Sequence, residues 1–180
     1  MSVEEALAQR RSVRSFIDQE LSAEEIGQLL WAAQGVTDPR GLRAAPSAGA
    51  LYPIELYVLT PEGLYHYRPG SHSLGAVVAG DLREPLWQAA LQQDALRDAP
   101  AVFVITAEYQ RTAAKYGERA VRYVHMEAGH AAQNLLLQAV ALGLGGVPIG
   151  AMRDEQVQRA LSLPREHEPL YLLPVGRPAQ

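Results

Sequence analysis

The sequence predicts an α+β fold, built as a single domain over residues 1–180. Residues 101–107, AVFVITA, form a continuous apolar run of the kind found in a central strand. Residues 116–142 carry the longest helical pattern, because apolar side chains recur there every three or four positions. Helical and strand patterns alternate along the chain, but the strands are few and irregularly spaced. This favours α+β over a doubly wound parallel sheet.

The chain opens with two predicted helices. Residues 2–16 begin with apolar side chains at helical spacing and with acidic side chains in the first turn, where the helix dipole favours them. We therefore expect one helix from Ser2 to about Phe16. Ser22 and Glu25 form a capping-box pattern that starts a second helix, and Gly35 is its expected end.

The rest of the chain is predicted from turn residues and from strand composition. Residues 36–53 are rich in Gly, Pro, Ala and Ser and are predicted to form a loop. Gly143 is the expected end of the long helix. The remaining predicted elements are a strand over 54–60, a hairpin of 63–68 with 74–78, helices over 82–91 and from 154, and a last strand over 170–175.

Composition excludes several classes of function. The 180 residues carry a net charge of −4, which argues against non-specific nucleic-acid binding. The absence of cysteine excludes disulfides, thiolate metal sites and a cysteine nucleophile. His125 and His130, two of the five histidines, are five positions apart and no HExxH motif is present, so no metal site is expected. The charged N-terminus and the short, glycine-rich apolar run at 135–147 predict neither a signal peptide nor a membrane span, so we expect a cytoplasmic protein.

An arginine cluster near the start of the chain, RRSVRSF at 10–16, stands out from this mildly acidic background. In a helix Arg10 and Arg14 would share a face, with Arg11 about 100° away. Two guanidinium groups and the Ser12 hydroxyl could then hold one phosphate group. The alternative is a solvated helix end, since charge clusters usually face solvent.

Three further stretches could contact a ligand or carry chemistry. The small residues of AAPSAGALYP, 44–53, would let the backbone approach a flat ligand, although the stretch could equally be a tight loop. GLGGVPIG, 143–150, follows a helix and so fits a helix end and turn better than a dinucleotide loop. Lys115 and Tyr116 could act as a general acid/base pair if desolvation lowers the lysine pKa, or they could be ordinary surface residues.

Taken in order, these stretches resemble a known family over residues 7–177. RRSVRSF resembles the opening motif of the nitroreductase superfamily of flavoenzymes. PSAGALYPIELYV, GLYHYRPGSHSL, KYGERAVRYVHMEAGHAAQNLLLQAVALGLG and LPVG resemble its SagB-type dehydrogenases, the azoline oxidases of thiazole/oxazole-modified peptide pathways. The resemblance implies a mostly antiparallel central sheet flanked by helices, in an intertwined homodimer with FMN at two equivalent interface sites.

The resemblance also implies roles for individual residues. The phosphate and ribityl chain of FMN would be held by Arg10, Ser12 and Arg14, with Arg11 contributing mainly backbone and Arg177 helping to neutralise the phosphate. The residues expected to lie against the flavin are Pro46, Ser47 and Ala48 of the partner subunit, with Pro148, Ile149 and Gly150 packing over the isoalloxazine and offering backbone amides. Many nitroreductases have Glu-Gly where this chain has Gly150-Ala151, so one side-chain contact is lost.

Two reactions are compatible with this resemblance. The azoline oxidases use a Lys-Tyr pair to remove a proton, and Lys115-Tyr116 align with it, which implies azoline-to-azole dehydrogenation of a peptide or small molecule. A general reductase would instead use NAD(P)H to reduce nitro or quinone acceptors and would need no such base. A flavin-binding protein or structural subunit without turnover is the alternative to both.

Overall fold

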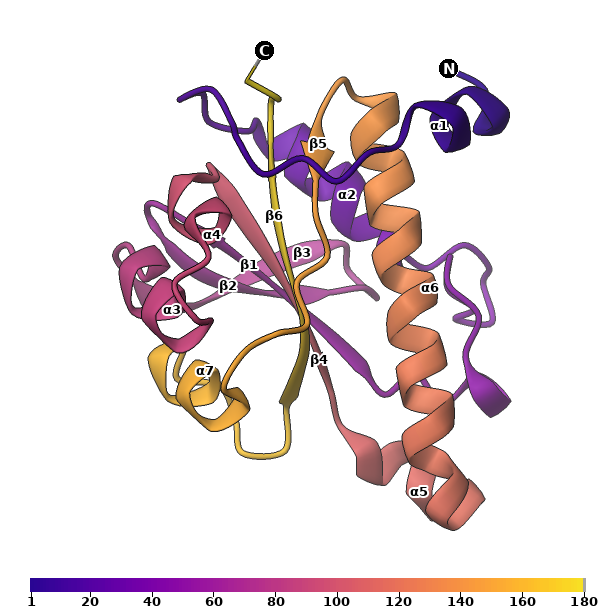
Figure 1. Ribbon diagram of the computed structural model, residues 1–180. Helices are drawn as coiled ribbons and strands as arrows, with labels where there is room; N and C mark the ends of the chain where they lie inside the picture. The colour runs from indigo at the N-terminus through magenta and orange to yellow at the C-terminus, as the bar shows by residue number, and fades with distance from the viewer. Residues whose placement is uncertain (180) are drawn as a thin grey trace.

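The computed structural model describes residues 1–179 and contains a six-stranded sheet in the order β3-β2-β1-β4-β6-β5 (Figure 1). All five strand pairs are antiparallel. The strands are β1 (Ile54–Thr60), β2 (Gly63–Arg68), β3 (Ser73–Ala79), β4 (Ala101–Ala107), β5 (Gly145–Gly146) and β6 (Glu168–Gly176). The predictions of an α+β fold, of a hairpin around PGSHS and of a central strand over 101–107 are therefore confirmed.

Helices cover both faces of the sheet. Alternate residues of the central strand β4 point to opposite sides, and because both sets are buried, each face needs a cover of helices. Phe103 and Ile105 of β4 pack with α2 (Ala23–Gln34) and α6 (Ala120–Ala141) in one buried cluster. Val102 and Val104 pack in a second cluster with α3 (Arg83–Ala89), α4 (Asp94–Asp98) and α7 (Asp154–Ala160). Figure 1 shows α3, α4 and α7 on the opposite side of the sheet from α6.

The first helix is shorter than predicted. α1 (Val3–Gln9) starts with a complete capping box at Ser2, but Arg10 leaves the helix at φ −57°, ψ 122°. The residues that follow are extended: Ser12 pairs with Gly146, and Phe16 pairs with Pro178. The predicted helix to Phe16 is wrong because backbone hydrogen bonds to β5 and to the C-terminal segment, which are distant in sequence, replace the helical ones.

The long helix over 116–142 is also divided differently from the prediction. α5 (Tyr109–Tyr116) ends at Gly117, whose φ of +55° is readily adopted only by glycine. A short 3₁₀ turn, η2 (Gly117–Arg119), then leads into α6. Lys115 and Tyr116 thus close α5 and do not start a long helix. The predicted end at Gly143 is confirmed by its φ of +73°.

The remaining helix predictions agree with the structure to within a few residues. Ser22 and Glu25 form the expected capping box of α2, and Gly35 is its C-cap. The short helix α4 was not predicted, and neither was α5 before Tyr116. None of the helices within residues 1–179 combines the length and the apolar character that a membrane crossing requires.

Candidate functional site

The N-terminal arginines lie on an extended segment that runs beside β5. The amide of Val13 donates to the carbonyl of Gly146 at 3.1 Å. In an extended chain residues two apart share a side, so the spacing of Arg10, Ser12 and Arg14 suits one side of this segment. These three residues thus lie on extended backbone, and not on the helix face that the sequence led us to expect.

Arg11 faces away from this group. Its Nη1 donates to the carbonyls of Ala8 at 2.9 Å and of Arg10 at 2.7 Å, at the C-terminal end of α1. Arg10 and Arg14 form no ion pair with any side chain of residues 1–179. The side chains of Arg10 and Arg14 are thus available to an anion, whereas Arg11 is engaged at a helix end.

Arg177 is brought to the same region by the C-terminal segment. Its carbonyl accepts from the amide of Ile17 at 3.0 Å, and the amide of Ala179 donates to the carbonyl of Ser15 at 3.0 Å. Nη2 of Arg177 lies 2.8 Å from Glu25 Oε1, while Nη1 is buried and has no hydrogen-bond partner among residues 1–179. A buried guanidinium donor without a partner fits an anionic group such as a phosphate.

The turn at 148–150 offers less backbone than the sequence suggested. The amide of Ile149 donates to the carbonyl of Leu172 at 2.8 Å, and the carbonyl of Ile149 accepts from the amide of Leu172 at 2.9 Å. The side chain of Ile149 is buried. Pro148 and Gly150 are exposed on either side. Of the predicted amides, that of Ile149 is already used within the chain, so a ligand could be met by the Gly150 amide and by the Pro148 ring.

The loop before β1 carries the predicted residues Pro46, Ser47 and Ala48 and is held in an unusual conformation. Ser47 Oγ accepts from the amide of Tyr52 at 2.9 Å. Gly49, Ala50 and Tyr52 have φ of +65°, +54° and +49°. Positive φ is costly for residues other than glycine and tends to be found where function needs it.

Lys115 and Tyr116 converge on this loop. A Cβ added at Gly49 would lie 2.8 Å from Tyr116 Oη and 3.0 Å from Lys115 Nζ. Lys115 Nζ also lies 5.4 Å from the centre of the Tyr116 ring. The ammonium group and the phenol therefore sit together against the backbone of the loop. Lys115 is exposed, so the single chain does not supply the desolvation that the acid/base role requires.

Arg111, one helical turn before Lys115, fixes this end of α5. Its Nη2 lies 2.6 Å from both Glu55 and Glu108, and its Nη1 donates to the carbonyl of Tyr52 at 3.0 Å. The strand β1, the loop and the helix are thus joined through one guanidinium group. Burial alone would raise the pKa of the Glu55 carboxyl group, but the hydrogen bond with His66 and the positive charge of Arg111 together lower it below its ordinary value.

Glu127 is a buried carboxyl group that the sequence analysis missed. It is 3% exposed, on the face of α6 that lies toward the loop, and its Oε1 has no partner among residues 1–179. Burial raises its pKa to about 7, and a hydrogen bond from Ser47 and the charge of Arg43 only partly offset this. Its position, three after the buried Val124 and four before the buried Ala131, was a detectable signal, since such positions are otherwise apolar.

The predicted site residues form two groups within one chain. The segment that carries Arg10, Ser12 and Arg14 passes near the C-terminal end of α6, where Ser12 pairs with Gly146, while Lys115 and Tyr116 belong to α5, ahead of the N-terminal end of α6 (Figure 1). α6 has 22 residues and is therefore about 33 Å long. The arginine group and the Lys-Tyr pair of one chain are thus too far apart to contact a single flavin.

Comparison with known proteins places this arrangement in a family. The model of the nitroreductase family matches residues 7–177. MJ1384 of Methanocaldococcus jannaschii, which is named as a nitroreductase, is 44% identical over 98% of this chain and 91% of its own length. A crystal structure of a protein from Ralstonia eutropha JMP134, described as a nitroreductase, superposes with a TM-score of 0.91 at 33% identity, covering all of this chain and 84% of that one.

More distant relatives have names that point to different reactions. The FMN reductase (NADPH) of Bacillus subtilis is 29% identical over 97% of this chain and 65% of its own length. The microcin B17-processing protein McbC of Escherichia coli is 29% identical over 79% of this chain and 57% of its own length. The chain thus spans little more than half of McbC. The family match and the 44% identity to MJ1384 show that the chain belongs to the nitroreductase family and is an oxidoreductase of that superfamily.

Proposed function

We propose that the protein is an FMN-dependent oxidoreductase that removes a hydride and a proton from its substrate, as in azoline-to-azole dehydrogenation. When bound, FMN would accept the hydride. Arg10, Ser12 and Arg14 would hold its phosphate and ribityl chain from one side of the extended segment. The unpartnered Nη1 of Arg177 supports this assignment, because it needs an acceptor that the chain does not provide.

The observation that carries the dehydrogenase proposal is the convergence of Lys115 Nζ and Tyr116 Oη on Gly49. Gly49 directly follows the residues proposed to line the flavin, Pro46, Ser47 and Ala48. A proton leaving the substrate there would be taken up by the Lys-Tyr pair, with the Lys115 amine in its neutral form.

The separation of the two groups supports a homodimer. Because α6, about 33 Å long, lies between the arginine group and the Lys-Tyr pair, each flavin would take its phosphate contacts from one subunit and the loop 46–49 with Lys115 and Tyr116 from the partner. This arrangement would also cover Lys115 and supply the desolvation that is missing in the single chain.

A second candidate is NAD(P)H-dependent reduction of nitro, quinone or flavin acceptors. It is favoured by the similarity to the FMN reductase (NADPH) of Bacillus subtilis. In such a reaction the flavin site would be the same, but Lys115 and Tyr116 would not be needed for turnover.

One set of measurements separates these proposals. The purified protein should show the two visible and near-ultraviolet absorption bands of bound FMN. A colourless protein that FMN does not reconstitute would overturn both candidates. Anaerobic NADH or NADPH should leave the flavin of a dehydrogenase oxidised and should bleach the flavin of a reductase.

The double variant Lys115→Ala/Tyr116→Ala tests the Lys-Tyr role directly. It should retain the flavin and lose oxidation of azoline peptides. Unchanged oxidation in that variant would rule out a role for the pair. A protein that binds FMN but turns over neither type of substrate would support a flavin-binding role without catalysis.

A further inference from the structure

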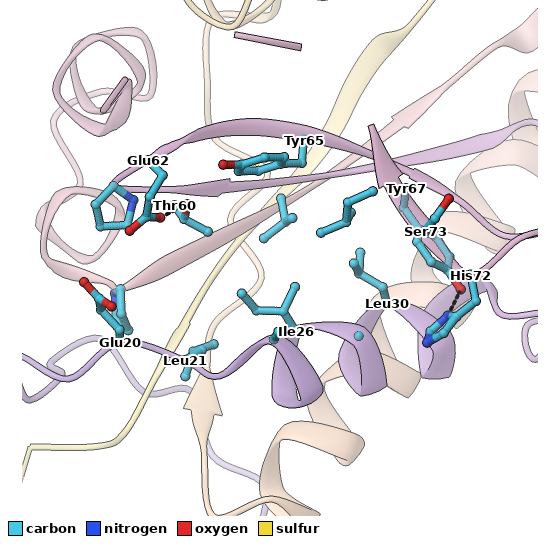
Figure 2. Close-up of a pocket in the computed structure, with 16 residues that line it drawn as sticks. Glu20, Leu21, Ile26, Leu30, Thr60, Glu62, Tyr65, Tyr67, His72 and Ser73 are labelled. Carbon is cyan, nitrogen blue, oxygen red and sulfur yellow. Dashed lines mark hydrogen bonds between the residues drawn. The ribbon is translucent and has the colours of Figure 1, made fainter. Parts of the chain in front are cut away.

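A cavity of about 460 Å³ lies between α2 and the sheet, away from the flavin site. Figure 2 shows Ile26 and Leu30 of α2 facing Tyr65 and Tyr67 of β2 across it. The volume and the apolar, aromatic lining are those of a small-molecule site. None of the residues proposed to hold FMN or to carry the Lys-Tyr chemistry lines this cavity.

The helix side of the cavity is kept open by a glycine. Gly27 lies in the interior of α2, where glycine is the least favourable residue apart from proline. The nearest side chain to a Cβ added there is His72, at 3.5 Å, so space does not explain the absence of a side chain. A large side chain at this position would enter the cavity. Glycine at position 27 therefore leaves the cavity open.

The far end of the cavity is closed by an organised turn. His72 has φ of +47°, a conformation that non-glycine residues rarely adopt, and its Nδ1 lies 2.8 Å from Tyr67 Oη. Tyr67 is itself buried. The wall formed by these two side chains is therefore held in place by a hydrogen bond at the expense of backbone strain.

The other end carries negative charge. Among residues 1–179, Glu20 and Glu62 are the only carboxylates that line the cavity, and no lysine or arginine lines it. Figure 2 shows both at the end opposite His72, with Glu62 hydrogen-bonded to Thr60. That hydrogen bond lowers the pKa of Glu62, so its carboxyl group is ionised at neutral pH. The nearby Arg83 is already paired with Asp81. Phosphate-bearing ligands such as nucleotides would be repelled here.

We propose that this cavity is a second binding site, which takes a small hydrophobic amine with its apolar or aromatic body between α2 and β2 and its cationic end toward Glu20 and Glu62. The aromatic rings of Tyr65 and Tyr67 provide faces for such a body. The site is independent of the proposed flavin chemistry.

The test compares three phenylalkyl probes of similar size by calorimetry on the flavin-loaded protein. Phenethylamine should bind saturably, 2-phenylethanol more weakly, and 3-phenylpropionate at least about tenfold more weakly than the amine. Equal binding of the amine and the carboxylate, or no saturable binding at millimolar concentration, would overturn the proposal.

Variants locate the site. Gly27→Leu should abolish binding of all three probes, because the side chain fills the cavity, whereas Gly27→Ala should retain it. Glu20→Gln combined with Glu62→Gln should remove the preference for the amine and leave binding of 2-phenylethanol unchanged. Glu24→Gln, on the same helix but outside the cavity, is the matched control. Unchanged binding in Gly27→Leu would contradict the assignment, and the glutamate pair decides the question if that variant fails to fold.

The flavin spectrum and turnover are recorded on the same variants. We expect both to match those of the unaltered protein, since the cavity shares no residue with the proposed flavin site. A failure of the amine proposal therefore leaves the flavin proposal intact, and the reverse also holds.

Discussion

Val13 and Gly145 are in such close contact that no larger residue fits at position 145: a Cβ added there would lie 2.6 Å from Val13 Cγ2. This contact sets how near the arginine-bearing segment approaches β5. We expect Gly145→Ala to push the segment outward, to cost about 1–3 kcal/mol of stability and to weaken FMN binding. Val13→Gly combined with Gly145→Ala should restore binding, as measured by flavin fluorescence, because the Val13 Cβ would also lie only 2.9 Å from the added methyl group. If the double variant binds as poorly as Gly145→Ala alone, the contact is not what positions the arginines.

The side on which each arginine lies predicts its effect on cofactor binding. Arg10→Met and Arg14→Met should each weaken FMN binding by about tenfold or more, since each removes a charge-assisted hydrogen bond to phosphate. Riboflavin, which lacks the phosphate, should bind these variants almost as well as it binds the unaltered protein. Arg11→Met is the control, because its guanidinium group is engaged by the carbonyls of Ala8 and Arg10. An equal loss with all three variants would contradict the extended arrangement.

Substitutions at two neighbouring loop residues, Gly49 and Ala50, should have different effects: the first should lower turnover and the second should raise stability. Gly49→Ala would place a methyl group against Tyr116 Oη and Lys115 Nζ, so we expect turnover to fall while flavin remains bound. Ala50→Gly should stabilise the protein by about 1 kcal/mol, because it relieves a φ of +54° at a residue that has a Cβ. Steady-state kinetics and urea unfolding measure the two effects. A stabilising Gly49→Ala would mean that the Lys-Tyr pair does not sit against this backbone.

Glu127 predicts a particular dependence of stability on pH. Its pKa in the folded protein is about 7, raised from 4.5 chiefly by burial. The folded state therefore binds more protons than the unfolded chain between these values, so this contribution to stability is full below pH 4.5 and is lost as the pH rises to 7. The loss is of the order of 3 kcal/mol.

Glu127→Gln isolates this contribution. The variant should unfold at higher urea concentration than the unaltered protein at pH 8, and the difference should shrink at pH 5. Glu24→Gln, an exposed position on α2, should show no such pH-dependent gain. A difference that is the same at both pH values would show that Glu127 does not change its protonation between folded and unfolded states.

Most elements could be predicted because their signals are local. The capping box at Ser22, the apolar run over 101–107 and the hairpin around PGSHS depend on residues within a few positions of one another. The errors came where distant residues decide the outcome. The segment after Gln9 could continue a helix on its own, and only the hydrogen bonds to Gly146 and Arg177, far along the chain, make it extended. At Gly117 the left-handed backbone interrupts a pattern that otherwise continues smoothly into α6.

The candidate site was predictable in its residue types but not in its grouping. The resemblance named the arginines, the loop and the Lys-Tyr pair, yet no spacing in the sequence indicates that Gly49 meets Lys115 or that α6 separates the pair from Arg10. Glu127 was missed because only the apolar residues of the helical pattern were considered. A carboxyl group on the buried face of the helix was the signal that could have identified it.

The backbone bonds between Ile17 and Arg177 and between Ser15 and Ala179 tie the proposed phosphate site to the folding of the sheet. The arginine segment, although early in the sequence, cannot form these bonds until residues 177–179 lie beside it. These residues directly follow β6, so the site would form only as that strand takes its place in the sheet. Flavin loading would therefore report on folding across residues 10–179, and not only on the presence of the arginines.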